Sequence, residues 1–266
     1  MRTALTIAGS DSGGGAGIQA DLKTFAAHGV FGTSAITAVT AQNTLGVIGW
    51  LALPTDLVTA QIEAVAGDIG ADAVKTGMLA NAAIVEAVAA AIQSLDLPHV
   101  VVDPVMVAKG GDRLLAIDAM VALRSELLPR AHIVTPNIPE AEVIAGMHIE
   151  SAEAMREAGE RILALGPRVV LIKGGHLDTP DEVVDVVCSR EDGTYELRGP
   201  RIPGTSTHGT GCTLASAIAA NLALGKGDRE AIELARAYLE GAIRHAPGLG
   251  RGHGPLNHFW FWRGVY

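Results

Sequence analysis

The chain has few cysteines, little basic charge and none of the common phosphate-binding signatures. Two cysteines in 266 residues are too few for a disulfide framework or a four-cysteine zinc site. Lys and Arg total 20 against 29 Asp and Glu, a formal net charge of −9. With no basic tail, this balance argues against a nucleic-acid-binding protein and a polybasic membrane-surface protein. Phosphorylated small molecules are not excluded, because backbone N–H groups bind phosphate without basic side chains.

Two further absences concern targeting and membranes. No charged segment followed by a continuous apolar run opens the chain, so we expect no secretion and a cytoplasmic location. No charged residue lies between Lys23 and Asp56, but polar residues such as His28 and Gln42 interrupt that stretch. A membrane-spanning helix needs about 20 predominantly apolar residues. We therefore expect the charge-free stretch to form a buried sheet edge and cleft.

What is present fits one large α/β domain, residues 1–266. The chain is 48% hydrophobic and 18% charged, enough for a packed core. Short apolar runs without in/out alternation predict strands covered on both faces, and helical patterns alternate with them. The expected strands are Leu5–Ala8, Thr33–Val39, Ala73–Thr76, Val100–Asp103, Ile133–Thr135 and Val169–Lys173; the expected helices are Gly17–Ala27, Leu57–Ala66, Ala82–Leu95, Ile117–Leu127, Ala152–Leu165, Cys212–Leu224 and Arg229–His245.

This alternation predicts a mostly parallel sheet with helices on both faces. Thr55 and Asn81 are the expected N-caps of two of the helices. The runs Val183–Cys188 and Tyr195–Arg201 flank Glu191-Asp192-Gly193, a hairpin signal that adds an antiparallel edge. In open α/β sheets the ligand lies beyond the carboxyl ends of the strands, so the residues after each strand are the candidates for a site.

The segment Gly9–Gly17 follows the first strand and holds five glycines. The dinucleotide pattern GxGxxG fails, because Ile18 stands where a glycine is needed, and no P-loop is present. The protein-kinase motifs are also absent. We interpret the segment as a substrate-contacting loop, because glycines let the backbone approach a ligand closely. The alternative is a flexible strand-to-helix turn.

The segment Thr207–Cys212 leads into a helix rich in small residues. Gly209, Thr210 and Gly211 before a helix leave several N–H groups pointing one way, and the helix dipole adds partial positive charge. This predicts an anion hole for a transferring phosphoryl group. Cys212 falls in the first turn, where the pKa of a thiol is lowered, so it could accept a proton from a substrate hydroxyl. The alternative is a buried structural cysteine, as we expect for Cys188.

Two residues after other strands suit a flat ligand. Gln42 carries an acceptor and two donors in one plane, which fits the edge of a heteroaromatic base. The alternative, a turn amide that bonds its own backbone, is equally compatible with the sequence. Met78 could form the wall of an aromatic-ligand site, but a core position is the default for a single methionine.

A third group suits a metal and phosphates. Asp103 ends a run of valines, and a carboxylate there is costly unless it is paired or faces a cleft. Asn137 and Glu140 lie three residues apart and offer oxygen atoms, which Mg²⁺ prefers. Lys173 ends another strand and could reach a phosphate. The alternatives are a helix cap for Asp103, a capping box for Asn137 and Glu140, and a solvated surface lysine for Lys173.

Three histidines near the end of the chain match no standard zinc spacing, and we expect surface or packing roles for them. They are His245, His253 and His258.

Taken together, these segments closely resemble the bifunctional hydroxymethylpyrimidine/phosphomethylpyrimidine kinases of thiamine biosynthesis, in the ribokinase-like superfamily. The likeness spans nearly the whole chain in the family's order. The matching segments are Ala8–Asp21, Ala38–Thr44, Lys75–Met78, Val102–Met106, Thr135–Asn137, Lys173–His176, His208–Cys212 and Gly252–Pro255. The resemblance implies a three-layer α/β/α fold and a kinase that uses ATP and Mg²⁺, as a homodimer. It implies two transfers, first to the hydroxymethyl group of 4-amino-5-hydroxymethyl-2-methylpyrimidine and then to the resulting monophosphate.

The resemblance also implies roles for individual residues of the matching segments. The pyrimidine pocket would be formed by Gly9, Asp21, Gln42, Met78 and Val105; the anion hole by Gly209, Thr210, Gly211 and Cys212, with Cys212 as base; the nucleotide site by Asn137, Lys173 and His208; and the metal site by Asp103 and Glu140. Many sugar kinases of the superfamily have Asp where this branch has Cys212, a departure that bears on the identity of the base. The expected ligands are the pyrimidine and ATP, with no nucleic acid and no membrane.

Two other functions fit parts of the same pattern. A pyridoxal kinase of the same branch would act on another heteroaromatic ring that carries a hydroxymethyl group. A non-catalytic pyrimidine-binding module on this fold would bind the ring without turning over ATP. The simultaneous presence of an anion hole, metal-type carboxylates and Lys173 argues against the second of these.

Overall fold

The computed structural model describes residues 1–106, 117–177, 181–204 and 206–262. Its strands form one nine-stranded sheet in the order β3-β2-β1-β4-β5-β6-β7-β8-β9. The pairs from β2 through β1, β4, β5 and β6 to β7 are parallel, and the remaining pairs, at both ends of the sheet, are antiparallel. The mostly parallel sheet is therefore confirmed, and so is the antiparallel edge made by the β8–β9 hairpin.

All the strands expected from the sequence are present, and β3 is additional. The strands are β1 (Thr3–Asp11), β2 (Phe31–Asn43), β3 (Gly46–Ala52), β4 (Ala73–Thr76), β5 (Val100–Val102), β6 (Ile133–Val134), β7 (Val169–Ile172), β8 (Glu182–Ser189) and β9 (Gly193–Pro200). The central strands run parallel, so the residues that follow them lie together at one edge of the sheet.

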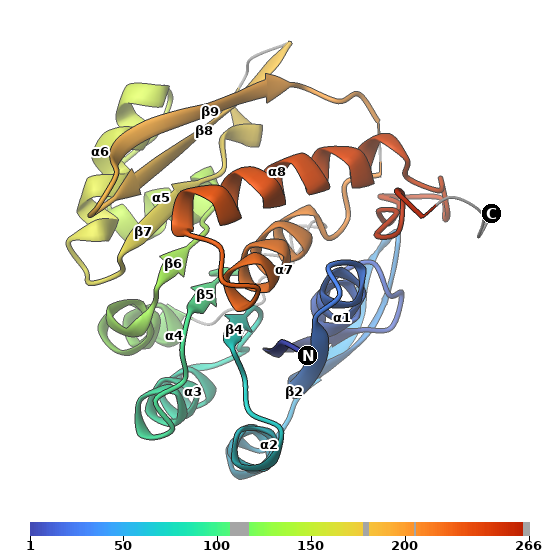
Figure 1. Ribbon diagram of the computed structural model, residues 1–266, viewed down its shortest axis with the longest axis vertical. Coiled ribbons are helices and arrows are strands. Elements are labelled where there is room, and N and C mark those ends of the chain that lie inside the picture. The colour runs from blue at the N-terminus through green and yellow to red at the C-terminus, as the bar shows by residue number, and fades with distance from the viewer. Residues whose placement is uncertain (107–116, 178–180, 205, 263–266) are drawn as a thin grey trace.

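Helices cover both faces of the sheet (Figure 1). They are α1 (Gly17–Ala27), α2 (Thr55–Asp68), α3 (Ala82–Ser94), α4 (Ile117–Ala122), α5 (Ile138–Ala145), α6 (Ala152–Leu163), α7 (Thr210–Ala223) and α8 (Asp228–Arg244), with a π-helical turn at Leu123–Leu127 and 3₁₀ turns at Leu128–Arg130 and Gly174–His176. One core holds Val101 with side chains of α1, α7 and α8. The other holds Val100 and Val102 with side chains of α2 to α6. Burial of both faces explains why the strands lack alternation.

The charge-free stretch between Lys23 and Asp56 was expected to form a buried sheet edge, and the structure agrees only in part. Its first part is buried in β2, but its second part forms β3, at the end of the sheet. Ile48 and Leu51 of β3 are 80% and 70% exposed. The prediction of a sheet edge is confirmed, and the prediction that it is buried is wrong for β3, because the middle of this edge strand, from Ile48 to Leu51, is exposed.

Of the two N-caps predicted from the sequence, one is confirmed. The side chain of Asn81 accepts the N–H of Ile84, as expected of the N-cap of α3. The prediction for Thr55 is wrong, because Pro54 occupies the N-cap position of α2 and Thr55 is its first residue. None of the helices in the described ranges is both long and apolar enough to cross a lipid bilayer.

Candidate active site

The candidate residues gather where the parallel strands end. Asp103 directly follows β5, and Lys173 directly follows β7. Asn137, which opens α5, forms an isolated parallel bridge with Lys173. The N-terminus of α7 comes to the same edge, since a Cβ at Gly211 would lie 3.3 Å from the Lys173 Nζ and 3.4 Å from an Asp103 carboxylate oxygen. The sequence-based expectation that these segments meet is therefore confirmed.

The turn before α7 needs glycine at position 209. Gly209 has φ +81 and is the N-cap of α7. A Cβ there would lie 1.9 Å from the carbonyl oxygen of Gly15, so the turn packs directly on the glycine loop. Both the left-handed backbone and the lack of space exclude a side chain. The free N–H groups of the first turn of α7 thus open beside Lys173 and Asp103, which is the arrangement an anion hole requires.

The prediction that the Cys212 thiol has a lowered pKa is wrong. Cys212 does lie in the first turn of α7 and is half-buried. The pKa of its thiol is nevertheless raised to about 11, mainly by desolvation and also by the carboxylates of Asp21 and Asp103, against the lowering effect of the Lys75 ammonium. The thiol is therefore protonated in the ligand-free protein at neutral pH. Whether it acts as the base remains a prediction.

Behind Cys212 lies a buried ion pair that the sequence did not single out. Lys75 and Asp21 are both 0% exposed, and the Lys75 Nζ donates to both carboxylate oxygens of Asp21 at 2.8 and 2.9 Å. The hydroxyl groups of Thr6 and Ser216 also donate to Asp21, each at 2.6 Å. Asp21 is thus fully partnered within the core, and its predicted contact with the pyrimidine remains untested.

The carboxylate of Asp103 is paired with Lys173. The Lys173 Nζ lies 2.9 Å from Asp103 Oδ1 and 4.0 Å from Glu140 Oε2. The Lys173 side chain is 16% exposed, so the alternative of a solvated surface lysine is wrong. Burial raises the pKa of Glu140 to about 7, against the opposing effect of Lys173. One cation therefore lies between two buried acidic groups.

Asn137 and Glu140 form the capping box that was the alternative to a metal site. The Asn137 side chain accepts the N–H of Glu140 at 2.9 Å, and Glu140 Oε2 accepts the N–H of Asn137 at 2.8 Å. Both residues are thereby fixed at the start of α5. The capping box engages one Glu140 oxygen, and the metal and nucleotide roles of the two residues stay predictions.

The buried carboxylates of Asp103 and Glu140 fit Mg²⁺ in chemistry and number. Mg²⁺ is commonly held by one or two carboxylates, phosphate oxygens and retained waters. Asp103 is 2% exposed, and its side-chain partners among the described residues are Lys173 and the Thr135 hydroxyl. Asp103 and Glu140 are two carboxylates, and in the described ranges no group of three or more His, Cys, Asp or Glu side chains is placed to hold a metal, at this site or elsewhere.

Apart from Asp21 in α1, the residues expected around the pyrimidine lie at the ends of β1, β2, β4 and β5. Gly9 borders Met78, since a Cβ at position 9 would lie 3.1 Å from the methionine sulfur. Met78 is buried within the core cluster, which agrees with the default for a single methionine. Val105 is half-buried and packs against the same cluster. The Gln42 side chain accepts from the Thr40 hydroxyl at 3.1 Å. The pyrimidine contacts of these residues stay predictions.

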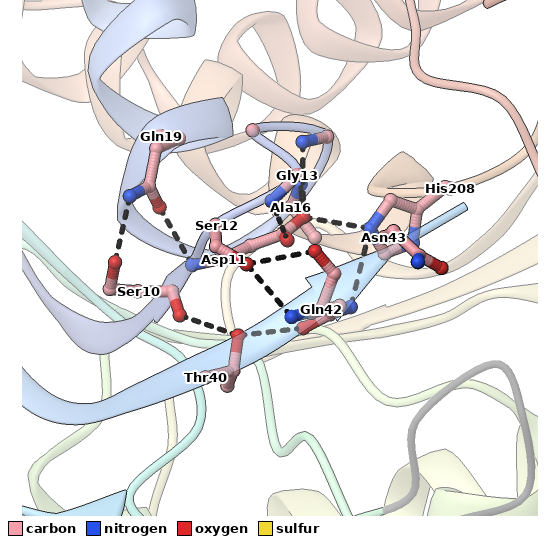
Figure 2. A network of polar contacts seen from close by, with 12 residues as sticks. Ser10, Asp11, Ser12, Gly13, Ala16, Gln19, Thr40, Gln42, Asn43 and His208 are labelled. Atoms are coloured by element: carbon pink, nitrogen blue, oxygen red, sulfur yellow. Dashed lines mark hydrogen bonds and ion pairs between the residues drawn. The ribbon is translucent and has the colours of Figure 1, made fainter. Parts of the chain in front are cut away.

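The glycine loop is organised by Asp11, another residue the sequence reading did not single out. Figure 2 shows the Asp11 carboxylate among the N–H groups of its own loop and beside the imidazole of His208. The nucleotide-binding role expected of His208 is untested, and in this structure its ring contacts Asp11 and Gln42. A usable sequence signal was the Asx turn, because Asp commonly bonds the N–H two residues further on.

Cys188 and two of the histidines near the end of the chain have the packing roles expected from the sequence. Cys188 is 1% exposed and lies in the core. The His245 ring stacks on Trp260 with centroids 5.4 Å apart. His258 is buried, and its Nε2 lies 3.2 Å from the Thr213 hydroxyl. Packing roles for these histidines are confirmed.

The family model for phosphomethylpyrimidine kinase matches residues 11–257. A relative from Geobacter sulfurreducens, the thiamine biosynthesis bifunctional protein ThiED, is 54% identical over 96% of this chain, and the chain spans about half (51%) of that longer protein. The hydroxymethylpyrimidine/phosphomethylpyrimidine kinase of Bacillus subtilis is 49% identical over 98% of this chain and 96% of its own length.

A solved structure of an ADP complex of Bacillus subtilis pyridoxal kinase is also similar. It superposes with a TM-score of 0.90 at 39% identity and covers 98% of both chains. The ribokinase-like three-layer α/β/α fold expected from the sequence is thereby confirmed. The range matched by the family model, residues 11–257, includes the glycine loop from Asp11 onward, the ends of the later strands and the N-terminus of α7. The chain belongs to the phosphomethylpyrimidine kinase family.

Proposed function

We propose that this protein transfers the γ-phosphoryl group of ATP to the hydroxymethyl group of 4-amino-5-hydroxymethyl-2-methylpyrimidine, and then phosphorylates the monophosphate to the diphosphate, in thiamine biosynthesis. The observation that carries this proposal is the glycine turn of α7, which opens beside the Lys173–Asp103 pair at the carboxyl edge of the sheet. Family membership supports the choice of substrate.

The residues supply positioning and charge, which is most of what phosphoryl transfer needs. The N–H groups of Gly209 to Cys212 stabilise negative charge on the transferring group, with the dipole of α7 adding to the effect. Lys173 and Asn137 hold the nucleotide phosphates. Gly9, Gln42, Met78 and Val105 hold the pyrimidine ring so that its hydroxymethyl oxygen faces the phosphorus. The thiolate form of Cys212, a minor form at neutral pH because the pKa of the thiol is raised, accepts the hydroxyl proton on its sulfur.

The proposal includes a requirement for magnesium. Asp103 and Glu140 would hold Mg²⁺ together with phosphate oxygens and waters. When bound, the ion neutralises phosphate charge. Lys173, 2.9 Å from Asp103 and 4.0 Å from Glu140, adds one positive charge beside the two acidic groups.

A pyridoxal kinase is the second candidate, because the solved pyridoxal kinase shares the fold at a TM-score of 0.90. Sequence identity favours the pyrimidine, since the Bacillus subtilis pyrimidine kinase is 49% identical and the pyridoxal kinase of the same organism 39%. A non-catalytic pyrimidine-binding module would have no use for the buried Lys173–Asp103 pair beside the anion hole.

Purified protein with ATP and Mg²⁺ should convert the pyrimidine to its monophosphate and then the diphosphate, with pyridoxal phosphorylated more slowly. Chromatographic separation of the products, coupled to measurement of ADP release, checks each step separately. A clear preference for pyridoxal would replace the proposed substrate. Pyrimidine binding in calorimetry with no ADP release would favour the non-catalytic module.

The expected homodimer is also a proposal, supported by the apolar surface of the β2–β3 edge. Val39, Ile48, Trp50 and Leu51 are exposed there, on strands paired antiparallel at the end of the sheet. Several exposed large apolar side chains along one unpaired sheet edge are typical of an interaction surface. We expect Ile48→Lys to convert a dimer to a monomer in sedimentation velocity. Leu234→Lys, at an exposed leucine of α8, should leave the dimer intact, and a monomeric unmodified protein would refute the proposal.

The proposal also covers the domain organisation and the location of the protein. All 266 residues form one kinase domain, which the single nine-stranded sheet supports. The cytoplasm is the expected location.

A further inference from the structure

The Asp11 carboxylate lies where three segments of the candidate site meet (Figure 2). Asp11 ends β1 and is 2% exposed. One of its oxygens accepts the N–H of Gly13 at 2.8 Å, and the other accepts the N–H groups of Gly15 at 3.0 Å and Ala16 at 2.8 Å. A single side chain therefore sets the shape of the glycine loop.

The same carboxylate binds His208, the residue before Gly209. The imidazole Nε2 lies 2.8 Å from Asp11 Oδ2. An ionised carboxylate only accepts, so Nε2 carries the hydrogen and donates it. Burial by itself would raise the pKa of Asp11, but the bonds from His208 and the loop N–H groups hold that pKa below its ordinary value. Asp11 is therefore anionic at neutral pH.

Close packing makes this contact rigid. A Cβ at Gly15 would lie 2.5 Å from Cδ2 of the His208 ring, and a Cβ at Gly209 would lie 1.9 Å from the Gly15 carbonyl oxygen. The glycine loop, the imidazole and the turn before α7 are thus in direct contact. A shift of His208 must move Gly209, because the two are adjacent in the chain and share one packed surface.

The pair also reaches the side where Gln42 lies. The side-chain amide nitrogen of Gln42, Nε2, is 3.4 Å from His208 Nε2. The Ser12 hydroxyl of the glycine loop donates to the backbone carbonyl oxygen of Gln42 and accepts the backbone N–H of Gln42, both at 2.8 Å. The loop shaped by Asp11 therefore fixes the end of β2 as well as the start of α7.

We propose that Asp11 and His208 are a positioning pair, whose hydrogen bond holds the Gly209–Gly211 turn at a fixed place relative to Gln42. This deepens the proposed function and rests on it: the turn holds the phosphoryl group, Gln42 holds the acceptor ring, and the pair sets the distance between them. Reacting atoms must stand about 3–3.5 Å apart, and a misplacement of about 1 Å costs on the order of 100-fold in rate.

Three variants test the pair. His208→Ala removes the donor, and Asp11→Asn removes the anionic acceptor. His208→Gln keeps an N–H donor on a side chain of similar reach. The matched control is His148→Ala, which breaks the contacts of an exposed histidine with Glu142 and Glu150. For each, kcat and KM are measured with the acceptor that the unmodified protein phosphorylates, and calorimetry gives Kd for ADP alone and for the acceptor alone.

We expect kcat to fall about 10- to 100-fold in His208→Ala and Asp11→Asn, with each separate Kd and the unfolding midpoint nearly unchanged. His208→Gln should recover most of kcat, and the Asp11→Asn/His208→Ala double variant should be no slower than the slower single variant. The control should match the unmodified protein.

Three results would overturn the proposal: a kcat within about threefold of the unmodified protein in both single variants, a loss of separate ligand affinity as large as the loss of kcat, or a double variant whose defect is the product of the two single defects. A parent protein that phosphorylates only pyridoxal would instead refute the proposed substrate, and the same comparison with pyridoxal would still decide the role of the pair.

Discussion

Replacing Cys212 with alanine should slow the first phosphorylation by about 10²–10⁴-fold, the usual contribution of a general base, and the second far less. The first acceptor is a hydroxyl group that must lose a proton during transfer. The second acceptor is a phosphate monoester, whose second pKa near 6 leaves it already ionised at neutral pH. Product-resolved rates of both steps on one preparation measure the difference directly.

The pH dependence of the first step tests the same role. With the thiol pKa raised to about 11, the thiolate fraction rises about tenfold per pH unit below that value. The rate of the first step should therefore climb from pH 7 to 9 in the unmodified protein, and the residual rate in Cys212→Ala should not share this dependence.

Cys188→Ala is the matched control, because it removes the other cysteine from the core without touching the site. It should leave both rates and the pH profile unchanged. An equal loss of both phosphorylations in Cys212→Ala would mean that the thiol positions groups and does not remove the proton.

The sequence predicted those parts of the site that depend on local chain chemistry. The Gly209–Gly211 turn and the Asn137–Glu140 capping box are each set by residues within a few positions of one another. The strand ends were also predictable, because buried parallel strands read as apolar runs that stop at Asp103 and Lys173.

The sequence could not predict what depends on distant segments. The pKa of Cys212 was assigned in the wrong direction, because its helix position is local, while the burial that raises the pKa and the carboxylates of Asp21 and Asp103 that act with it depend on distant segments. Strand β3 was missed because Gly46 and Gly49 interrupt its apolar pattern, and pairing with β2 supplies the order that the local sequence does not.

The second large effect is expected at Lys75, whose loss should destabilise the fold more than it alters any ligand contact. Replacement by methionine leaves the Asp21 carboxylate buried without a cation, and breaking a buried pair in this way costs about 3–5 kcal/mol. The Asp21→Asn/Lys75→Met double variant should recover much of that loss, since one of the Thr6 and Ser216 hydroxyls can still donate to the amide oxygen and the other can accept from the amide nitrogen. Urea unfolding at constant pH measures the difference.

Lys226→Met is the control, because it breaks the exposed Lys226–Glu230 pair and should cost less than about 1 kcal/mol. The pH dependence gives a further check. Burial alone would lower the pKa of Lys75, but the Asp21 carboxylate raises it above its ordinary value. The stabilisation is then fully present below the unfolded-state pKa of about 10.4 and is lost as pH rises through the higher folded-state pKa.

The stability gap between the unmodified protein and Lys75→Met should therefore be constant from pH 6 to 9 and shrink only in strongly alkaline solution. A single variant as stable as the Lys226→Met control would mean that Asp21 is satisfied without its cation. A double variant no more stable than Lys75→Met would mean that the lost contribution is the packing of the lysine chain in the core, because charge repair would then have changed nothing.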